Sequence, residues 1–212
     1  MLPGGTRGGR GAAAGGMEMG QLRLERHLHG VHVVLMCADD AEEQAEWVLS
    51  VLTRLPPGGL IPGRTLRFGW SSLRLDPRGD SLVVTEPDFD GDPLNDWRDD
   101  ITVTLRIQGR MLETTQTVGT EPLFPRYADK VAAVPGWDRS HRVAMARARA
   151  PEGTDSGWLI VPPGPPGDET FETFPVYSLL RRRPALMSAL ALPGGWVAEF
   201  EDDALVGYGK PD

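Results

Sequence analysis

The chain has 212 residues, with 22 Lys and Arg against 30 Asp and Glu and a formal net charge of −8. A general nucleic-acid binder needs a basic surface to neutralise phosphates, and docking on anionic lipid needs one as well, so this charge argues against both partners. The apolar fraction of 40% is enough for a packed core, and the length suits one domain or two small ones.

Cysteine content and hydropathy bear on the cell compartment. Cys37 is the only cysteine, so an internal disulfide and a zinc site with two or more cysteines are excluded. The N-terminal arginines are followed by glycine and alanine rather than by an apolar signal segment. The longest strongly apolar run, residues 33–38, is far shorter than the roughly 20 residues that cross a bilayer. We therefore expect a cytoplasmic protein with no membrane partner and no cofactor.

The first half of the chain is predicted to form a small mixed unit over residues 27–125. Residues 1–26 precede it, begin with a glycine-rich stretch and are predicted to be disordered. The continuous β-branched run 31–37 predicts a buried strand. An apolar stripe that ends at Leu55 predicts a helix, which Asp39 or Asp40 can cap in a capping box.

The next segments combine turn chemistry with two different periodicities. Residues 64–86 alternate around an Asp-Pro-Arg-Gly-Asp turn and predict a β-hairpin, and residues 86–100 predict an acidic loop. Residues 101–118 are ambiguous, because their first apolar residues alternate as in a strand. The possible cap at Asp99 or Asp100 and the glycine at 119 favour a helix.

The second half is predicted to form another small unit, residues 126–212, after a linker at 122–130. Its expected elements are strands at 130–134 and 141–149 around a Pro-Gly turn, a strand at 157–161, a rigid loop at 162–167, a short strand at 174–177, a short helix that starts at Pro184, and strands at 196–200 and 204–208. The expected fold class is therefore α+β: two small mixed units, mostly antiparallel strands with a few helices.

Three short patterns raise the question of catalysis. His27, His29 and His32 could hold a metal, but the chain lacks the further ligands that a metal-dependent hydrolase needs. The acidic triplet at 88–92 has proline where a calcium loop needs glycine. Ser156 lies in an Asp-Ser-Gly sequence without a recognisable general base, and the alternative is a turn that leads Trp158 into the core. We therefore expect no catalytic residue and no metal.

Acidic charge is concentrated in two segments. Residues 86–100 hold seven acidic residues and one arginine, a net of −6, and residues 199–203 add −4. Arginines gather elsewhere, notably at 181–183, and runs of this kind are usually solvated faces. The two acidic segments can steer a basic protein partner, with exposed aromatic side chains as anchors. The candidate partner-binding residues are Glu86, Asp88, Phe89, Asp90, Asp92, Asp96, Trp97, Glu199, Glu201, Asp202 and Asp203.

The second half also resembles a known family. The sequences Asp-Ser-Gly-Trp at 155–158, Phe-Pro-Val-Tyr-Ser-Leu at 174–179, Pro-Ala-Leu at 184–186 and Leu-Pro-Gly-Gly-Trp at 192–196 resemble the immunity protein 33 domain, over roughly residues 130–205. This bacterial domain, formerly one of unknown function, occurs beside polymorphic toxins. The motif residues expected to be mainly structural are Asp155, Ser156, Gly157, Trp158, Pro193, Gly194 and Trp196.

The resemblance implies a non-enzymatic protein that binds and occludes a cognate toxin, with a basic toxin domain as the expected partner. A small hydrolase that uses Ser156 or a metal on the histidine cluster is the alternative from another class. A general protein-interaction module is the third possibility. The identity of the toxin and the oligomeric state do not follow from the sequence.

Overall fold

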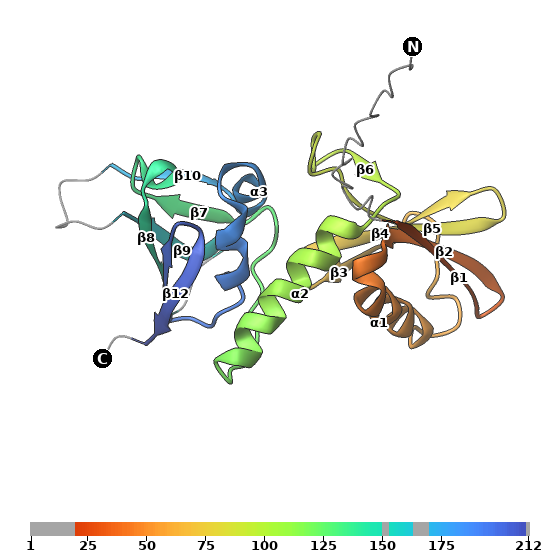
Figure 1. The fold of residues 1–212 in the computed structure, drawn as a ribbon. Helices are drawn as coiled ribbons and strands as arrows, with labels where there is room; N and C mark the ends of the chain where they lie inside the picture. The colour runs from red at the N-terminus through yellow and green to blue at the C-terminus, as the bar shows by residue number, and fades with distance from the viewer. Residues whose placement is uncertain (1–19, 150–152, 163–169, 211–212) are drawn as a thin grey trace, which may run out of the picture.

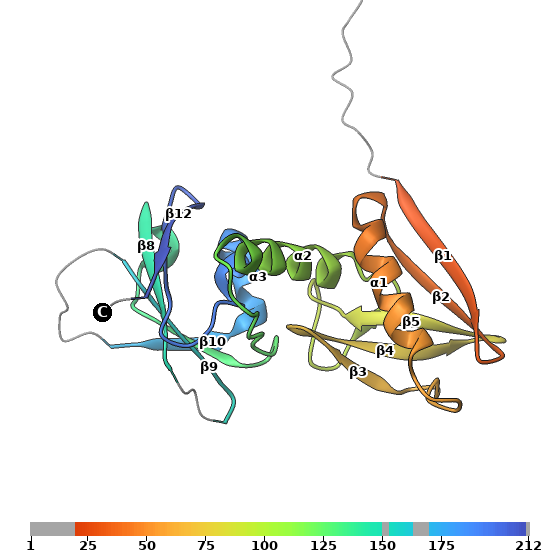
Figure 2. The ribbon, with the colours of Figure 1, turned by 90° about the horizontal axis from the view of Figure 1, so that it is seen from below.

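A computed structural model describes residues 20–149, 153–162 and 170–210. The molecule is elongated, with one mixed β-sheet at each end and a long helix, α2 (Thr102–Thr117), between them (Figures 1 and 2). Most strand pairs are antiparallel, and each sheet contains one parallel pair. The predicted α+β class with two mixed β-sheets is therefore confirmed.

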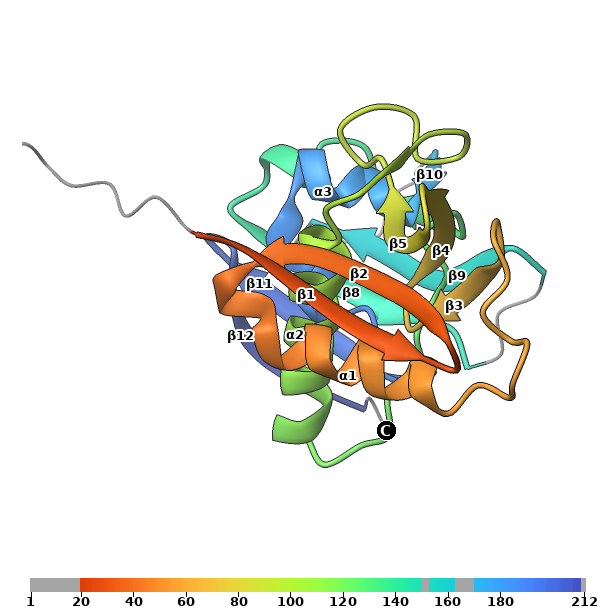
Figure 3. The ribbon, with the colours of Figure 1, turned by 90° about the vertical axis from the view of Figure 1, so that its right-hand side faces the viewer.

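The first sheet has the strand order β1-β2-β5-β4-β3, with a short β6 on β5. Helix α1 (Glu42–Thr53) packs on it through its buried side chains, beside the β1–β2 hairpin (Figure 3). The parallel pair is β2 with β5, which the α1 crossover makes possible. The strands are β1 (Gln21–Leu28), β2 (Val31–Ala38), β3 (Thr65–Phe68), β4 (Ser71–Arg78), β5 (Ser81–Pro87) and β6 (Trp97–Arg98).

The prediction of disorder is wrong for residues 21–26, which belong to β1 and pair with β2. Leu22 and Leu24 alternate with polar residues and pack against the core, a two-residue period that the preceding glycines obscure. Residues 1–19 lie outside the described part of the chain.

Two further local predictions for this unit need correction. The segment 64–86 is a three-stranded meander rather than one hairpin, because the chain also turns at Gly69, whose φ is +55°. The capping box before α1 is absent: a short 3₁₀ turn, Asp39–Ala41, precedes the helix, and Asp39 accepts a hydrogen bond from the amide of Asp40 instead.

Helix α2 confirms the helical interpretation of residues 101–118. The Asp100 carboxylate accepts a hydrogen bond from the Thr102 amide at 2.9 Å, and Gly119 follows the helix with φ +66°. Leu105, near its start, packs in the core of the first unit, whereas Met111, one and a half turns later, packs in the core of the second. One helix therefore joins both cores.

The second sheet has the order β10-β7-β9-β8-β11-β12. The predicted strands β7 and β8 are not neighbours, because β9 lies between them and runs parallel to β7. The predicted rigid loop lies outside the described residues beyond Pro162. The strands are β7 (Lys130–Ala133), β8 (Arg142–Arg147), β9 (Asp155–Val161), β10 (Glu172–Pro175), β11 (Val197–Glu201) and β12 (Ala204–Gly209).

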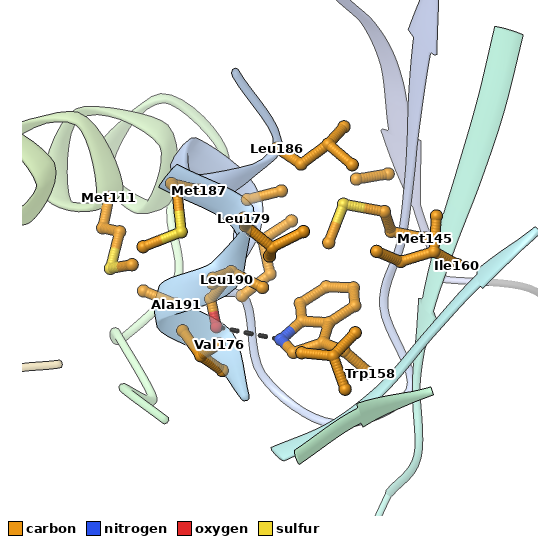
Figure 4. Close-up of a cluster of buried hydrophobic side chains, with 14 of the residues drawn as sticks. Met111, Met145, Trp158, Ile160, Val176, Leu179, Leu186, Met187, Leu190 and Ala191 are labelled. Atoms are coloured by element: carbon orange, nitrogen blue, oxygen red, sulfur yellow. Dashed lines mark hydrogen bonds between the residues drawn. The ribbon is translucent and has the colours of Figure 1, made fainter. Parts of the chain in front are cut away.

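Short helices cover one face of the second sheet. They are α3 (Leu179–Arg182) and the 3₁₀ segment Pro184–Ala189, which confirms a short helical element starting at Pro184. Trp158 of β9 packs against them and donates from its indole nitrogen to the Leu190 carbonyl at 3.1 Å (Figure 4). Met111 reaches the same apolar cluster from α2. Among the described residues, no helix has the length and hydropathy that crossing a membrane requires.

Candidate protein-interaction surface

Glu86, the first residue of the acidic segment, is fully buried and is not a surface contact. Its carboxylate accepts hydrogen bonds from the Thr104 amide at 2.6 Å and from Arg98 Nε at 2.9 Å. Burial raises the pKa of Glu86 to about 7, against the opposing effect of these hydrogen bonds. Glu86 therefore fixes the loop and the start of α2 rather than contacting a partner.

The predicted aromatic anchors are also less available than expected. Phe89 is 4% exposed and stacks on Trp70, with 5.1 Å between the ring centroids. Trp97 is half-buried, and the Arg74 guanidinium lies 4.4 Å from its ring centre. The prediction of Phe89 as an exposed anchor is therefore wrong, because an apolar residue in a charged loop serves as that loop's attachment to the core.

Three of the remaining acidic side chains of the loop are exposed. Asp88 is half-buried and accepts a hydrogen bond from the Asp90 amide, whereas Asp90, Asp92 and Asp96 are exposed. Arg98 pairs with Asp90 at 2.8 Å. Hydrogen bonds from Asn95 and from the backbone lower the pKa of Asp92, so this carboxylate stays charged. The loop is an ordered turn that presents three carboxylates.

The second acidic segment is the turn between β11 and β12. Asp202 and Asp203 have φ angles of +46° and +64°, the left-handed conformation that aspartate tolerates in turns. His141 contacts both Asp202 and Glu201, and Arg142 lies 3.4 Å from Glu201. The neighbouring basic groups thus offset part of the −4 charge of this segment.

The arginine run 181–183 holds both acidic segments. Arg181 donates to the Phe89 carbonyl at 3.0 Å, and Arg183 pairs with Asp203. Arg182, between them, reaches Glu172 at 2.8 Å. The prediction that this run is a solvated face is wrong for Arg183, which is 5% exposed, whereas Arg181 is exposed and Arg182 is half-buried.

Ser156 has a structural environment rather than a catalytic one. Its hydroxyl donates to the Lys130 carbonyl at 2.6 Å and accepts from the Trp158 amide, and the residue is 1% exposed. Asp155 accepts from the Gly157 amide at 2.8 Å, and Gly157 has φ +78°. The segment shapes the start of β9 and directs Trp158 into the core, so the observed contacts give no support to a nucleophilic serine.

The other motif residues form a close turn beside β8. A Cβ atom on Gly194 would lie 2.6 Å from the Arg149 carbonyl oxygen, so only glycine fits. The carbonyl of half-buried Pro193 accepts from the Trp196 amide at 3.3 Å. The Lys210 amine lies 5.5 Å from the centre of the Trp196 ring.

Arg147 is the central residue of the second unit that sequence reasoning missed. It is 5% exposed and donates to the carbonyls of Ser156, Leu190 and Leu192 at 3.1, 3.1 and 2.6 Å. Burial lowers the pKa of Arg147 to about 10. The alternation of β8 predicts this inward orientation, because Arg147 lies four residues after the buried Val143 and therefore on the same face of the strand.

The histidines at 27–32 do not converge on a metal position. His27 stacks on His32 across the β1–β2 hairpin, with 4.8 Å between the ring centroids, and His29 lies in the turn with φ +50°. His32 is engaged by Ser81 and Glu25. Among residues 20–149, 153–162 and 170–210, no group of three His, Cys, Asp or Glu side chains is arranged to hold a metal ion.

Two adjoining cavities of about 440 and 410 Å³ lie along the junction of α1 and α2. Gln44 and Gly109 line both of them, and the 43% exposed Trp47 lines the second. This groove does not follow from the sequence, because it depends on how closely two separately predicted helices approach.

Comparison with protein families identifies one match. Residues 110–206, slightly less than half of the chain, match the Imm33-like domain, from the C-terminal part of α2 to β12. The match covers the Arg147 contacts and the turn at 199–203, and it leaves the first sheet outside. Comparisons with curated proteins and with solved structures find no match. The resemblance inferred from the motifs is confirmed, because residues 110–206 in the C-terminal half of the chain match the Imm33-like domain family.

Proposed function

We propose that this protein is a cytoplasmic immunity protein that binds a basic toxin domain and neutralises it by occlusion. The Imm33-like domain implies a toxin-immunity role and a protein partner. The binding surface that we propose consists of the exposed carboxylates of the acidic loop and of the β11–β12 turn. These are Asp90, Asp92, Asp96, Glu199 and Asp202.

The observation that carries this proposal is the attachment of both acidic segments to the arginine run 181–183, at the end of α3. Arg181 holds the loop through its backbone at Phe89, and Arg183 holds the turn through Asp203. Both segments therefore contact the same arginine run, although almost a hundred residues separate them in the sequence. The side chains of Asp90 and Asp202 remain 84% and 75% exposed. A surface whose carboxylates are fixed in advance loses little entropy on binding and attracts a basic partner electrostatically.

A binding role also agrees with the environments of the Ser156 hydroxyl and the Cys37 thiol. The Ser156 hydroxyl donates to a backbone carbonyl inside the fold, and burial raises the pKa of the Cys37 thiol to about 11. At neutral pH that thiol is protonated and a weak nucleophile. Occlusion of the toxin, rather than chemistry on it, is therefore the mechanism that we propose.

Growth rescue tests this function. The toxin domain encoded beside this gene is expressed with the full chain, with the charge-reversed double variant Asp92→Lys/Asp96→Lys, or with Asp80→Lys as the control. Asp80 is an exposed acid in the β4–β5 turn. We expect rescue by the wild type and the control and loss of rescue by the double variant. Failure of the wild type to rescue growth contradicts the proposal.

A further inference from the structure

We propose that the free edge of β12 binds an extended segment of the partner, which adds to the second sheet as a further strand and carries a basic residue opposite Gly207. This inference rests on the proposed function, because it states how the Imm33-like domain would hold a toxin. Strand addition of this kind uses main-chain hydrogen bonds for affinity and side-chain positions for specificity.

The four terminal strands of the two main sheet paths are not equally protected. Charged side chains and proline on an edge strand oppose pairing with another chain. Strand β1 carries Arg23 and Glu25, β3 carries Arg67, and β10 ends in Pro175. Strand β12 has the sequence Ala-Leu-Val-Gly-Tyr-Gly, with neither feature; its pairing with β11 shifts in register between Glu199 and Phe200 and is regular from Gly207 to Gly209. Among the described residues, only β11 pairs with it.

Apolar side chains are exposed on this same strand. Val206 is 53% and Tyr208 is 47% exposed, which places both among the most exposed large apolar residues of the described chain. An edge strand with two such side chains is a favourable site for pairing with another strand, since the added strand covers them from water.

The outer face of the sheet is hollowed beside this edge. Gly207 and Gly209 pair with Glu199 and Val197 of β11, and together with Tyr208 and Lys210 these residues line a cavity of about 410 Å³. Neither glycine has a left-handed φ, and a Cβ atom on Gly209 would meet nothing within 4 Å. Larger residues would therefore fit at both positions. Because glycines stand there instead, space remains for a side chain of a bound partner.

Glu199 is the acidic side chain in the lining of this cavity, whereas the Lys210 amine of the same lining lies over the Trp196 ring. The Glu199 carboxylate lies 3.5 Å from the position of a Cβ atom on Gly207, so the side chain lies over Gly207 of the edge strand β12. It is exposed and forms no ion pair with the described residues. A strand added beside β12 would lie about 4.8 Å away. A lysine or arginine opposite Gly207 on the outer face would then reach the Glu199 carboxylate.

Hydrogen exchange of the full chain tests the inference with two probes. One probe is the toxin domain encoded beside this gene. The other is the synthetic peptide acetyl-Thr-Val-Lys-Val-Thr-Val-amide at millimolar concentration, compared with the peptide that has glutamate in place of lysine. We expect both the toxin domain and the lysine peptide to slow exchange in residues 204–209, with at least a threefold smaller effect from the glutamate peptide.

Variants separate edge pairing from general surface effects. Val206→Lys/Tyr208→Lys should weaken toxin binding at least tenfold, and Glu199→Gln should remove the preference for the lysine peptide. Ile61→Lys, at a 52% exposed apolar residue of the first unit, should leave both unchanged. Matching circular dichroism and melting temperatures of the variants establish that they are folded.

Each outcome decides the inference separately from the proposed function. Toxin neutralisation with protection elsewhere and unchanged binding by the edge variants overturns the inference and leaves the immunity role intact. If the toxin domain does not bind, the immunity role fails, and the peptide decides whether the edge accepts a strand. Concentration-dependent dimers that Val206→Lys/Tyr208→Lys abolishes would assign the edge to a second copy, which also overturns the inference.

Discussion

The guanidinium carbon of Arg147 lies 5.6 Å from the centre of the Trp158 ring, and the Leu190 carbonyl accepts a hydrogen bond from each of these side chains. An arginine and a tryptophan thus join two strands to the segment that follows the 3₁₀ helix. Since a buried charge without its hydrogen bonds is costly, this cluster makes the Imm33-like unit depend on one basic residue.

Replacement of Arg147 by methionine should destabilise the protein by about 3–5 kcal/mol, because several buried carbonyls lose their donor. Urea denaturation, followed by tryptophan fluorescence, measures this change. Arg149→Met is the matched control, since Arg149 is exposed, and it should change stability by less than about 0.5 kcal/mol. Equal stability of both variants would show that the carbonyl contacts of Arg147 contribute little.

Gly69→Ala should lower the stability of the first unit by more than the backbone strain of a positive φ at residue 69 accounts for. The added Cβ atom would lie 1.8 Å from Oε1 of the buried Gln108, in addition to the strain at φ +55°. Gly79→Ala is the control, because Gly79 has φ +59° and open space around it. We expect about 1 kcal/mol for the control and at least about 2 kcal/mol for Gly69→Ala.

A double-mutant cycle tests the cause of that difference. Gln108→Ala removes the clashing amide, whose nitrogen and oxygen have no hydrogen-bond partner among the described residues. The pair Gly69→Ala/Gln108→Ala should therefore be more stable than the sum of the two single changes predicts. Simple additivity would mean that the cost at Gly69 comes from its backbone alone.

Glu86 should give the protein a pH-dependent stability. Because its pKa is raised from 4.5 to about 7 in the folded state, the folded protein retains this proton to higher pH than the unfolded chain. Its contribution to stability should fall as pH rises from about 4.5 to about 7 and stay constant above that. The full change is about 3 kcal/mol.

The difference in unfolding free energy between wild type and Glu86→Gln isolates this contribution, because the other titrating groups are common to both proteins. Denaturation at pH 5, 6, 7 and 8 should show the wild type losing stability relative to the variant up to about pH 7. A difference that does not vary with pH would mean that Glu86 titrates near its ordinary value in the folded protein.

His141 should titrate above its ordinary range. The hydrogen bond that His141 donates to Asp202, together with the negative charge of Asp202, raises the pKa of His141, with a further contribution from Glu201. The stabilising pair is present below the unfolded pKa near 6.5 and is lost as pH rises through the higher folded value. Proton NMR of the imidazole should show a higher pKa in the wild type than in Asp202→Asn. Equal values in the two proteins would contradict the pairing.

Local periodicity and turn chemistry predicted much of the fold. Helix α2 followed from the acidic residues before it and the glycine at 119, and β11 and β12 followed from alternation around an acidic turn. The order of strands could not be predicted in the same way. The position of β9 between β7 and β8 depends on contacts that are distant in sequence, and the Pro-Gly turn after β7 suggested a hairpin that does not form.

The sequence predicts where acidic charge is concentrated in the candidate surface. It does not predict which of these side chains are buried or which residues they contact. Asp92 and Asp96 are exposed, as a polar loop implies, but no charge count shows that Glu86 is buried beneath the same loop. The run 181–183 illustrates the same limit. Three consecutive arginines suggest a basic patch, whereas each one reaches a partner that only the tertiary fold brings near.

The most direct test of the proposed immunity role is the dissociation constant of the full chain for the neighbouring toxin domain, measured by calorimetry at 50 and 300 mM salt. The account predicts a defined complex that weakens at least tenfold at the higher salt, and Asp92→Lys/Asp96→Lys should weaken it similarly at low salt. A tight complex that neither salt nor charge reversal weakens would contradict binding through the acidic surface. The absence of any complex would contradict the immunity role itself.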